Sequence, residues 1–114
     1  MAVIGRRVDK NHTQIVKALR KFPGASVFSM APLGSGIPDL CIGYLGVTVI
    51  AEVKGAKGKL NKAQQEFKDR WCGSEVIVLR TPDDCAALLN NMDRMRRVFG
   101  RIPGQDVDLD HEGG

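Results

Sequence analysis

The chain has few of the residues that hold zinc-binding or disulfide-bonded proteins together. Its 114 residues include 3 cysteines and 2 histidines, and no Cys-x-x-Cys pair occurs. This supply argues against the common tetrahedral zinc sites and against a disulfide framework. We therefore expect Cys41, Cys72 and Cys85 to be reduced thiols that are mostly buried. A metal in this protein must then be a hard ion held by carboxylates.

Long hydrophobic runs are also missing. No stretch approaches the roughly 20 apolar residues that a membrane-spanning helix requires, and the Met-Ala-Val-Ile-Gly start is too short for a secretory signal. These absences predict a cytoplasmic protein with no membrane contact. We expect a single domain, because 114 residues are too few to close a second hydrophobic core.

Charge is spread unevenly along the chain. Residues 1–80 contain 13 Lys or Arg against 6 Asp or Glu, whereas residues 81–114 contain 4 against 7. A basic body favours a polyanionic partner. Residues 104–114 carry four acidic and no basic side chains, so we expect a disordered tail after a domain that spans residues 1–103. Residues 1–10 are expected to form a loosely ordered basic arm.

Hydrophobic periodicity predicts an α/β fold with the element order α-β-β-β-α-β-α, a mixed sheet flanked by helices. Helices are expected to begin at Asn11, Asn61 and Thr81. The expected strands are residues 25–30, 39–44, 47–53 and 75–79, and Leu45-Gly46 is a hairpin turn between the second and the third. The first helix places Ile15, Ala18, Leu19 and Phe22 on one face and Lys17, Arg20 and Lys21 on the other.

Local signals mark where the helices begin. Asn11 with Gln14, and Asn61 with Gln64, have the spacing of a capping box. Thr81 is followed by Pro82 and two aspartates, which is typical of a capped helix start.

Three charged residues gather at the predicted hairpin. Side chains alternate along a strand, so Glu52 and Lys54 project to the same side. Asp39 becomes a cross-strand neighbour of Glu52, because the two positions are nearly symmetric about the turn. Two carboxylates beside an ammonium suit Mg²⁺, which typically uses one or two carboxylates together with water and substrate phosphate. The trio predicts attack of water on phosphorus.

The same residues resemble a known signature. Gly36-Ile37-Pro38-Asp39, twelve intervening residues and Glu52-Val53-Lys54 resemble the split motif of the PD-(D/E)xK nuclease superfamily. Gly-x-Pro-Asp-Leu at 36–40, followed later by Gly58-Lys59-Leu60 and Gln64, is similar to its VRR-NUC branch. The resemblance covers nearly residues 9–90 and is strongest to small stand-alone proteins of viral and bacterial genomes.

This resemblance implies a restriction-endonuclease-like core and a metal-dependent nuclease that hydrolyses DNA phosphodiester bonds. Asp39, Glu52 and the backbone carbonyl of Val53 would be ligands of Mg²⁺ or Mn²⁺. Lys54 would be the catalytic lysine and Gln64 an active-site residue of the following helix. The resemblance further implies a homodimer that acts as an endonuclease on branched DNA, such as Holliday junctions.

The first helix departs from the family pattern. Relatives often have an acidic residue there, and the matching position here is Gln14. A neutral amide binds a cation more weakly, which puts a second metal in doubt and makes His12 a possible substitute.

Several residues have a structural alternative. Gln64 could serve as both cap and site residue, and for Gln14 the cap is favoured. Lys57, Lys59 and Lys62 could contact DNA phosphates or form a solvated loop. Residues 55–60 are too short for a phosphate-binding P-loop, and no Ser or Thr follows Lys59.

Apolar side chains leave further alternatives. Phe67 and Trp71 are expected in the core rather than as base-stacking residues. Met92–Phe99 could be core or a dimer interface. At the level of function, the rival hypotheses are a basic nucleic-acid-binding module without catalysis and a protein-interaction adaptor.

Overall fold

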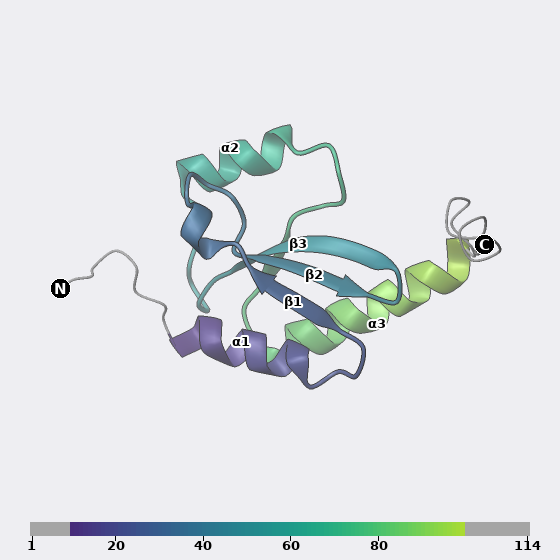
Figure 1. Cartoon of the computed structure of the whole chain (residues 1–114). Helices are drawn as coiled ribbons and strands as arrows, with labels where there is room; N and C mark the ends of the chain where they lie inside the picture. Colours follow the sequence, from purple (N-terminus) through teal and green to yellow (C-terminus); the bar gives the residue numbers. More distant parts are fainter. Residues whose placement is uncertain (1–9, 100–114) are drawn as a thin grey trace.

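The computed structural model describes residues 10–99 (Figure 1). Residues 1–9 of the predicted basic arm, the acidic tail and the outer limits of the predicted domain lie outside these residues, whereas Lys10 of the predicted arm is helical. Among the helices of residues 10–99, no segment has the length and apolarity needed to cross a bilayer.

The described chain is a mixed α/β fold with three α-helices and four strands. Their order matches the predicted α-β-β-β-α-β-α. The bounds are α1 Lys10–Arg20, β1 Ser26–Ser29, a 3-10 turn η1 Ala31–Leu33, β2 Leu40–Tyr44, β3 Val47–Val53, α2 Lys62–Arg70, β4 Ile77–Leu79 and α3 Pro82–Phe99.

The strands lie in the order β1-β2-β3-β4 within one sheet. The first three are antiparallel, and β4 joins β3 in parallel after the α2 crossover. Leu45 and Gly46 have φ values of 54° and 83°, which is typical of the tight turn that suits strand twist. The predicted β2–β3 hairpin is therefore confirmed, with Tyr44 paired to Val47.

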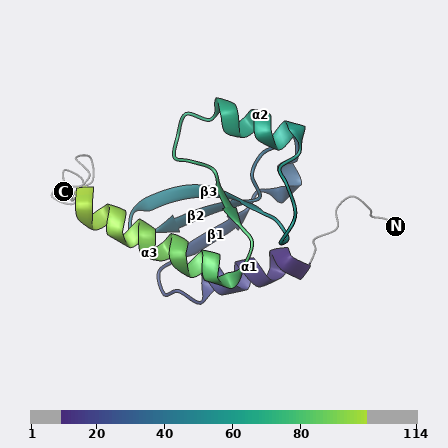
Figure 2. The same ribbon diagram turned by 180° about the vertical axis from the view of Figure 1, so that it is seen from behind.

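Helices α1 and α3 cover one face of the sheet, and α2 lies on the other side (Figures 1 and 2). The covered face follows strand alternation, because every second residue points to it. Burying a Leu or Ile side chain of this core contributes about 1.5–3 kcal/mol relative to exposure. The core consists of Ile15, Leu19, Val27, Leu40, Ile42, Val49, Ala51, Leu79, Cys85, Leu88, Leu89 and Met92.

Helix α2 stands outside this core and has no buried residue. Phe67 and Trp71 stack on each other with ring centroids 5.5 Å apart. Trp71 is 44% exposed and Phe67 is half-buried. The prediction that Phe67 and Trp71 belong to the core is therefore wrong, because Phe67 lies on α2, Trp71 directly follows that helix, and the core lies on the other face of the sheet.

One further prediction about burial is wrong for one residue, and the two alternatives left open for Met92–Phe99 can be compared with the structure. Cys85 is buried and Cys41 half-buried, but Cys72 is exposed in the loop after α2. At the end of α3, Met92 is core, whereas Val98 is 70% exposed. Burial, together with a smaller effect of the Asp84 charge, raises the pKa of the Cys85 thiol to about 11.

Two of the three predicted helix starts are confirmed. Asn61 and Gln64 form a complete capping box on α2. At α3, the Asp84 N–H donates to Thr81 Oγ1 at 3.1 Å, and Asp84 Oδ2 accepts from the Thr81 N–H at 3.1 Å. The predicted cap at Asn11 is wrong, because α1 already includes Lys10 and the Asn11 side chain is used elsewhere.

Candidate active site

Glu52 is the penultimate residue of β3 and is 1% exposed. Its neighbours Ala51 and Val53 pack against the core on the face that α1 and α3 cover, so alternation turns Glu52 to the opposite face. Lys54 follows β3, and its N–H donates to the Leu79 carbonyl at 3.1 Å. This bond continues the pairing of β3 with β4 by one residue and fixes the Lys54 backbone.

Asp39 directly precedes β2, and the pairing of Leu40 with Ala51 sets it beside Glu52. Asp39 Oδ2 accepts a hydrogen bond of 2.8 Å from the Val53 N–H. The Asp39 carbonyl accepts a hydrogen bond of 2.6 Å from the Met30 N–H. Hydrogen bonds from two backbone N–H groups therefore hold the side chain and the backbone of Asp39 at the open end of the hairpin, away from the turn.

The two carboxyl groups interact, with Lys54 nearby. The pKa of Glu52 is raised to about 8, chiefly by burial and further by hydrogen bonding with Asp39 and the Asp39 charge, while the Lys54 ammonium partly offsets the shift. Glu52 Oε1 is buried and has no hydrogen-bond partner among residues 10–99. The structure thus brings together the three residues that the sequence predicted as the catalytic centre.

The donor set fits one hard cation. An unsatisfied buried carboxylate oxygen is costly unless a cation or donor meets it. Residues 10–99 contain no cluster of three or more His, Cys, Asp or Glu side chains that could hold a metal. Two carboxylates suit Mg²⁺ or Mn²⁺ completed by water and substrate phosphate, rather than an ion held by protein alone. The Val53 carbonyl stays a predicted third ligand.

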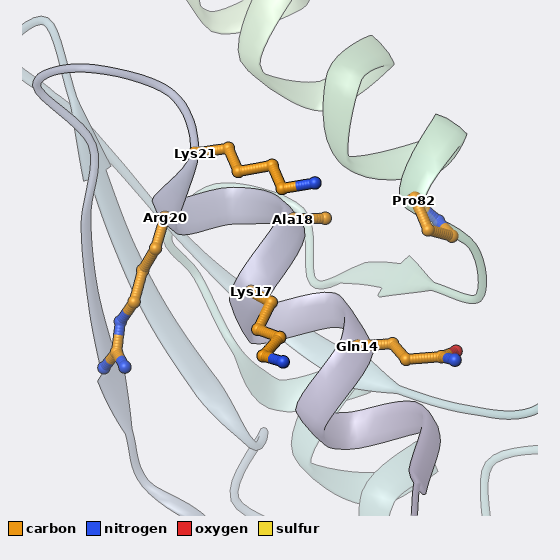
Figure 3. Close-up of a pocket in the computed structure, with 6 residues that line it drawn as sticks. All are labelled: Gln14, Lys17, Ala18, Arg20, Lys21 and Pro82. Carbon is orange, nitrogen blue, oxygen red and sulfur yellow. The ribbon is translucent and has the colours of Figure 1, made fainter.

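The beginning of α1 is attached to this centre by a residue that the sequence analysis assigned to another role. Asn11 Nδ2 donates to the Lys54 carbonyl at 2.6 Å. Gln14 is exposed and lines a hollow with Lys17, Lys21 and Pro82 (Figure 3). No hydrogen bond among residues 10–99 joins Gln14 to Asp39 or Glu52.

Gln64 lies at the start of α2 and completes its cap. Its Oε1 accepts from the Asn61 N–H at 2.9 Å, and its own N–H donates to Asn61 Oδ1 at 2.9 Å. The capping role is confirmed. The side-chain NH₂ group of Gln64 is not used by the cap, and its active-site role stays a prediction.

The lysine loop between β3 and α2 is held at its base by Arg80. Arg80 Nη1 donates to the carbonyls of Gly55 at 2.5 Å and Ala56 at 3.5 Å. A Cβ at Gly58 would lie 3.4 Å from the Lys54 side chain. The loop therefore begins against the candidate centre. The predicted phosphate-binding side chains it presents are all exposed: Lys57, Lys59 and Lys62.

Gly36 lets the segment before Asp39 approach α2. Its φ is +81°, and a Cβ there would lie 2.4 Å from the Ala63 carbonyl oxygen. Gly24 has a similar φ of +88° but open space around it. The contact at Gly36 thus positions the start of α2 against the loop that leads to Asp39.

We expect Gly36→Ala to lower the free energy of unfolding by about 1–3 kcal/mol more than Gly24→Ala, because both changes strain the backbone but only the first adds a clash. Urea denaturation of the two variants measures this difference. Equal losses would show that the Gly36 contact with α2 contributes nothing to stability.

No protein-family model, curated protein or solved structure matches this chain.

Proposed function

We propose that this protein is a divalent-metal-dependent nuclease of the PD-(D/E)xK, VRR-NUC type that hydrolyses DNA phosphodiester bonds. One observation carries the proposal. The carboxyl groups of Asp39 and Glu52 interact at the open end of the β2–β3 hairpin, beside Lys54. Glu52 Oε1 is buried and has no hydrogen-bond partner in the described chain. The antiparallel β1-β2-β3 order and the parallel β4 also support the restriction-endonuclease-like core.

Mg²⁺ or Mn²⁺ would be held by Asp39, Glu52 and the Val53 carbonyl. When bound, such an ion polarises a phosphate oxygen and acidifies a water molecule. Lys54 offsets the negative charge that develops on the phosphate during attack. The backbone bonds to Leu79 and Asn11 hold Lys54 in position before the substrate arrives.

The substrate that we propose is branched DNA, such as a Holliday junction, cut endonucleolytically by a homodimer. The net charge of +4 and the exposed lysines of the loop support a polyanionic substrate. A two-fold symmetric dimer matches a two-fold symmetric junction, and a chain of 114 residues has little surface to grip such a junction alone.

A second candidate is a basic nucleic-acid-binding module without catalysis. The exposed neutral amide of Gln14, where proteins of the VRR-NUC family often have an acid, favours it. It shares the charge pattern but predicts that bound DNA stays intact. A protein-interaction adaptor predicts negligible DNA binding at moderate salt.

The test is an assay of labelled linear, flap and four-way DNA with Mg²⁺, with EDTA as the control. We expect Mg²⁺-dependent cleavage with preference for the four-way substrate, and none in EDTA. A shifted band without cleavage in either Mg²⁺ or Mn²⁺ would establish the binding module instead.

A further inference from the structure

Helix α1 exposes a basic side that has no acidic counterpart. The helix contains no Asp or Glu, and Lys17, Arg20 and the following Lys21 are exposed. Within residues 10–99, one ion pair has its nitrogen and oxygen atoms less than 4 Å apart, and it joins Asp93 to Arg97, both on α3. Lys17, Arg20 and Lys21 therefore make no ion pair with carboxylates of the described chain.

A hollow of about 390 Å³ lies between α1 and the edge strand β1. Arg20 Nη2 donates to the Val27 carbonyl at 3.4 Å, so the guanidinium reaches from the helix to the strand. Figure 3 shows this side chain pointing toward the strands, away from Lys21. The hollow, called the α1–β1 groove below, is lined by His12, Thr13, Val16, Lys17, Arg20, Val27 and Ser29.

The polar groups of this groove are of the kinds that contact phosphate. Lys17 and Arg20 supply positive charge, and Thr13 and Ser29 supply hydroxyl groups. Lys17 and Arg20 also line a second hollow, of about 610 Å³, on the α3 side of the helix (Figure 3). These two cations thus form a ridge between two concave surfaces.

Two lining residues of the α1–β1 groove, Ser29 and His12, are neighbours of residues linked to the candidate active site. Ser29 pairs with Leu40, which directly follows Asp39. His12 follows Asn11, whose side chain bonds the Lys54 carbonyl. From His12 to Arg20 the helix rises about 12 Å, which equals the axial length of roughly three to four base steps of B-DNA at about 3.4 Å each.

We propose that the α1–β1 groove binds the sugar-phosphate backbone of the nucleic-acid strand that extends from the cleavage site. Lys17 and Arg20 each neutralise a phosphate, and Thr13 and Ser29 donate hydrogen bonds to phosphate oxygens. The identity of the ligand, and the direction in which the bound strand extends from the cleavage site, rest on the proposed function. The groove adds a second binding surface to the one proposed for Lys57, Lys59 and Lys62.

The test is fluorescence anisotropy of a labelled four-way DNA junction in EDTA, at salt concentrations from about 50 to about 200 mM. The double variant Lys17→Gln with Arg20→Gln is compared with Arg94→Gln with Arg96→Gln, which removes the same charge from the exposed surface of α3. We expect the first variant to bind about tenfold more weakly than the control and to lose about two from the salt slope. Thermal unfolding of both variants checks that the fold is kept.

Outcomes of two kinds, from DNA binding and from peptide binding, would overturn the proposed role of the groove. One is an equal loss in both double variants, or no salt-dependent DNA binding by the wild type. The other is a labelled polyglutamate peptide whose binding depends on Lys17 and Arg20 while DNA binding does not, which would assign the groove to an acidic protein.

The Mg²⁺ cleavage assay separates this proposal from the proposed function. Absence of cleavage together with a selective loss of DNA affinity in the Lys17 and Arg20 variant removes the nuclease and keeps the groove. Cleavage by the wild type together with equal losses in both variants removes the groove and keeps the nuclease.

Discussion

Replacing Lys54 with alanine is expected to reduce Mg²⁺-dependent DNA cleavage on the order of a hundredfold to a thousandfold, because the phosphate loses a fixed positive charge when its own negative charge grows. The fold should persist, since Lys54 is held through its backbone N–H and carbonyl rather than through its side chain. Single-turnover cleavage measures the chemical step without product release.

The control for this variant is Lys68→Ala, which removes a lysine from α2 outside the candidate site. Its cleavage rate should match the wild type. Lys54→Ala at a rate close to that of Lys68→Ala would exclude the proposed role of Lys54, whatever the behaviour of the two acids.

Replacing Glu52 with glutamine is expected to change how stability depends on pH in the metal-free protein. The pKa of Glu52 is about 8 in the fold against 4.5 for an unperturbed glutamate. The folded state therefore binds the proton more tightly than the unfolded state. The contribution of Glu52 to the free energy of unfolding is fully present below about pH 4.5. It is lost as pH rises to about 8, by at most about 1.4 kcal/mol per pH unit.

Glu52→Gln removes this loss, because an amide does not ionise. The gain in unfolding free energy over wild type should rise steadily between pH 4.5 and 8. Urea denaturation in EDTA across that range measures it, with the exposed Glu66→Gln on α2 as the control. Parallel stability curves for Glu52→Gln and wild type would contradict the buried acid pair.

Short-range signals predicted much of this fold. The bounds of β3, the turn at Leu45-Gly46 and the capping box of Asn61 with Gln64 all agree with the structure. Each depends on alternation, turn geometry or hydrogen bonds within a few residues. The proximity of Asp39 to Glu52 was predictable from the position of the turn, because the turn fixes which residues of the two strands lie opposite each other.

Contacts between distant segments were not predictable in the same way. Asn11 bonds the Lys54 carbonyl across 43 positions, and Arg80 bonds the Gly55 carbonyl across 25. Asn11 carries the signature of a cap, and nothing local reveals that its amide is used elsewhere. Trp71 was expected in the core because its spacing from Phe67 is helical, but where α2 packs depends on tertiary contacts such as that of Gly36 with Ala63.

The capacity of Asp39 and Glu52 to share one divalent cation is tested most directly by titrating the protein with Mn²⁺ and following the free ion by electron paramagnetic resonance. At a pH above that of the Glu52 transition, the wild type and Glu66→Gln should bind a single ion per chain. Asp39→Asn and Glu52→Gln should each lose that ion. Undiminished Mn²⁺ binding by either of these two variants, or none by the wild type, would contradict the proposed metal centre.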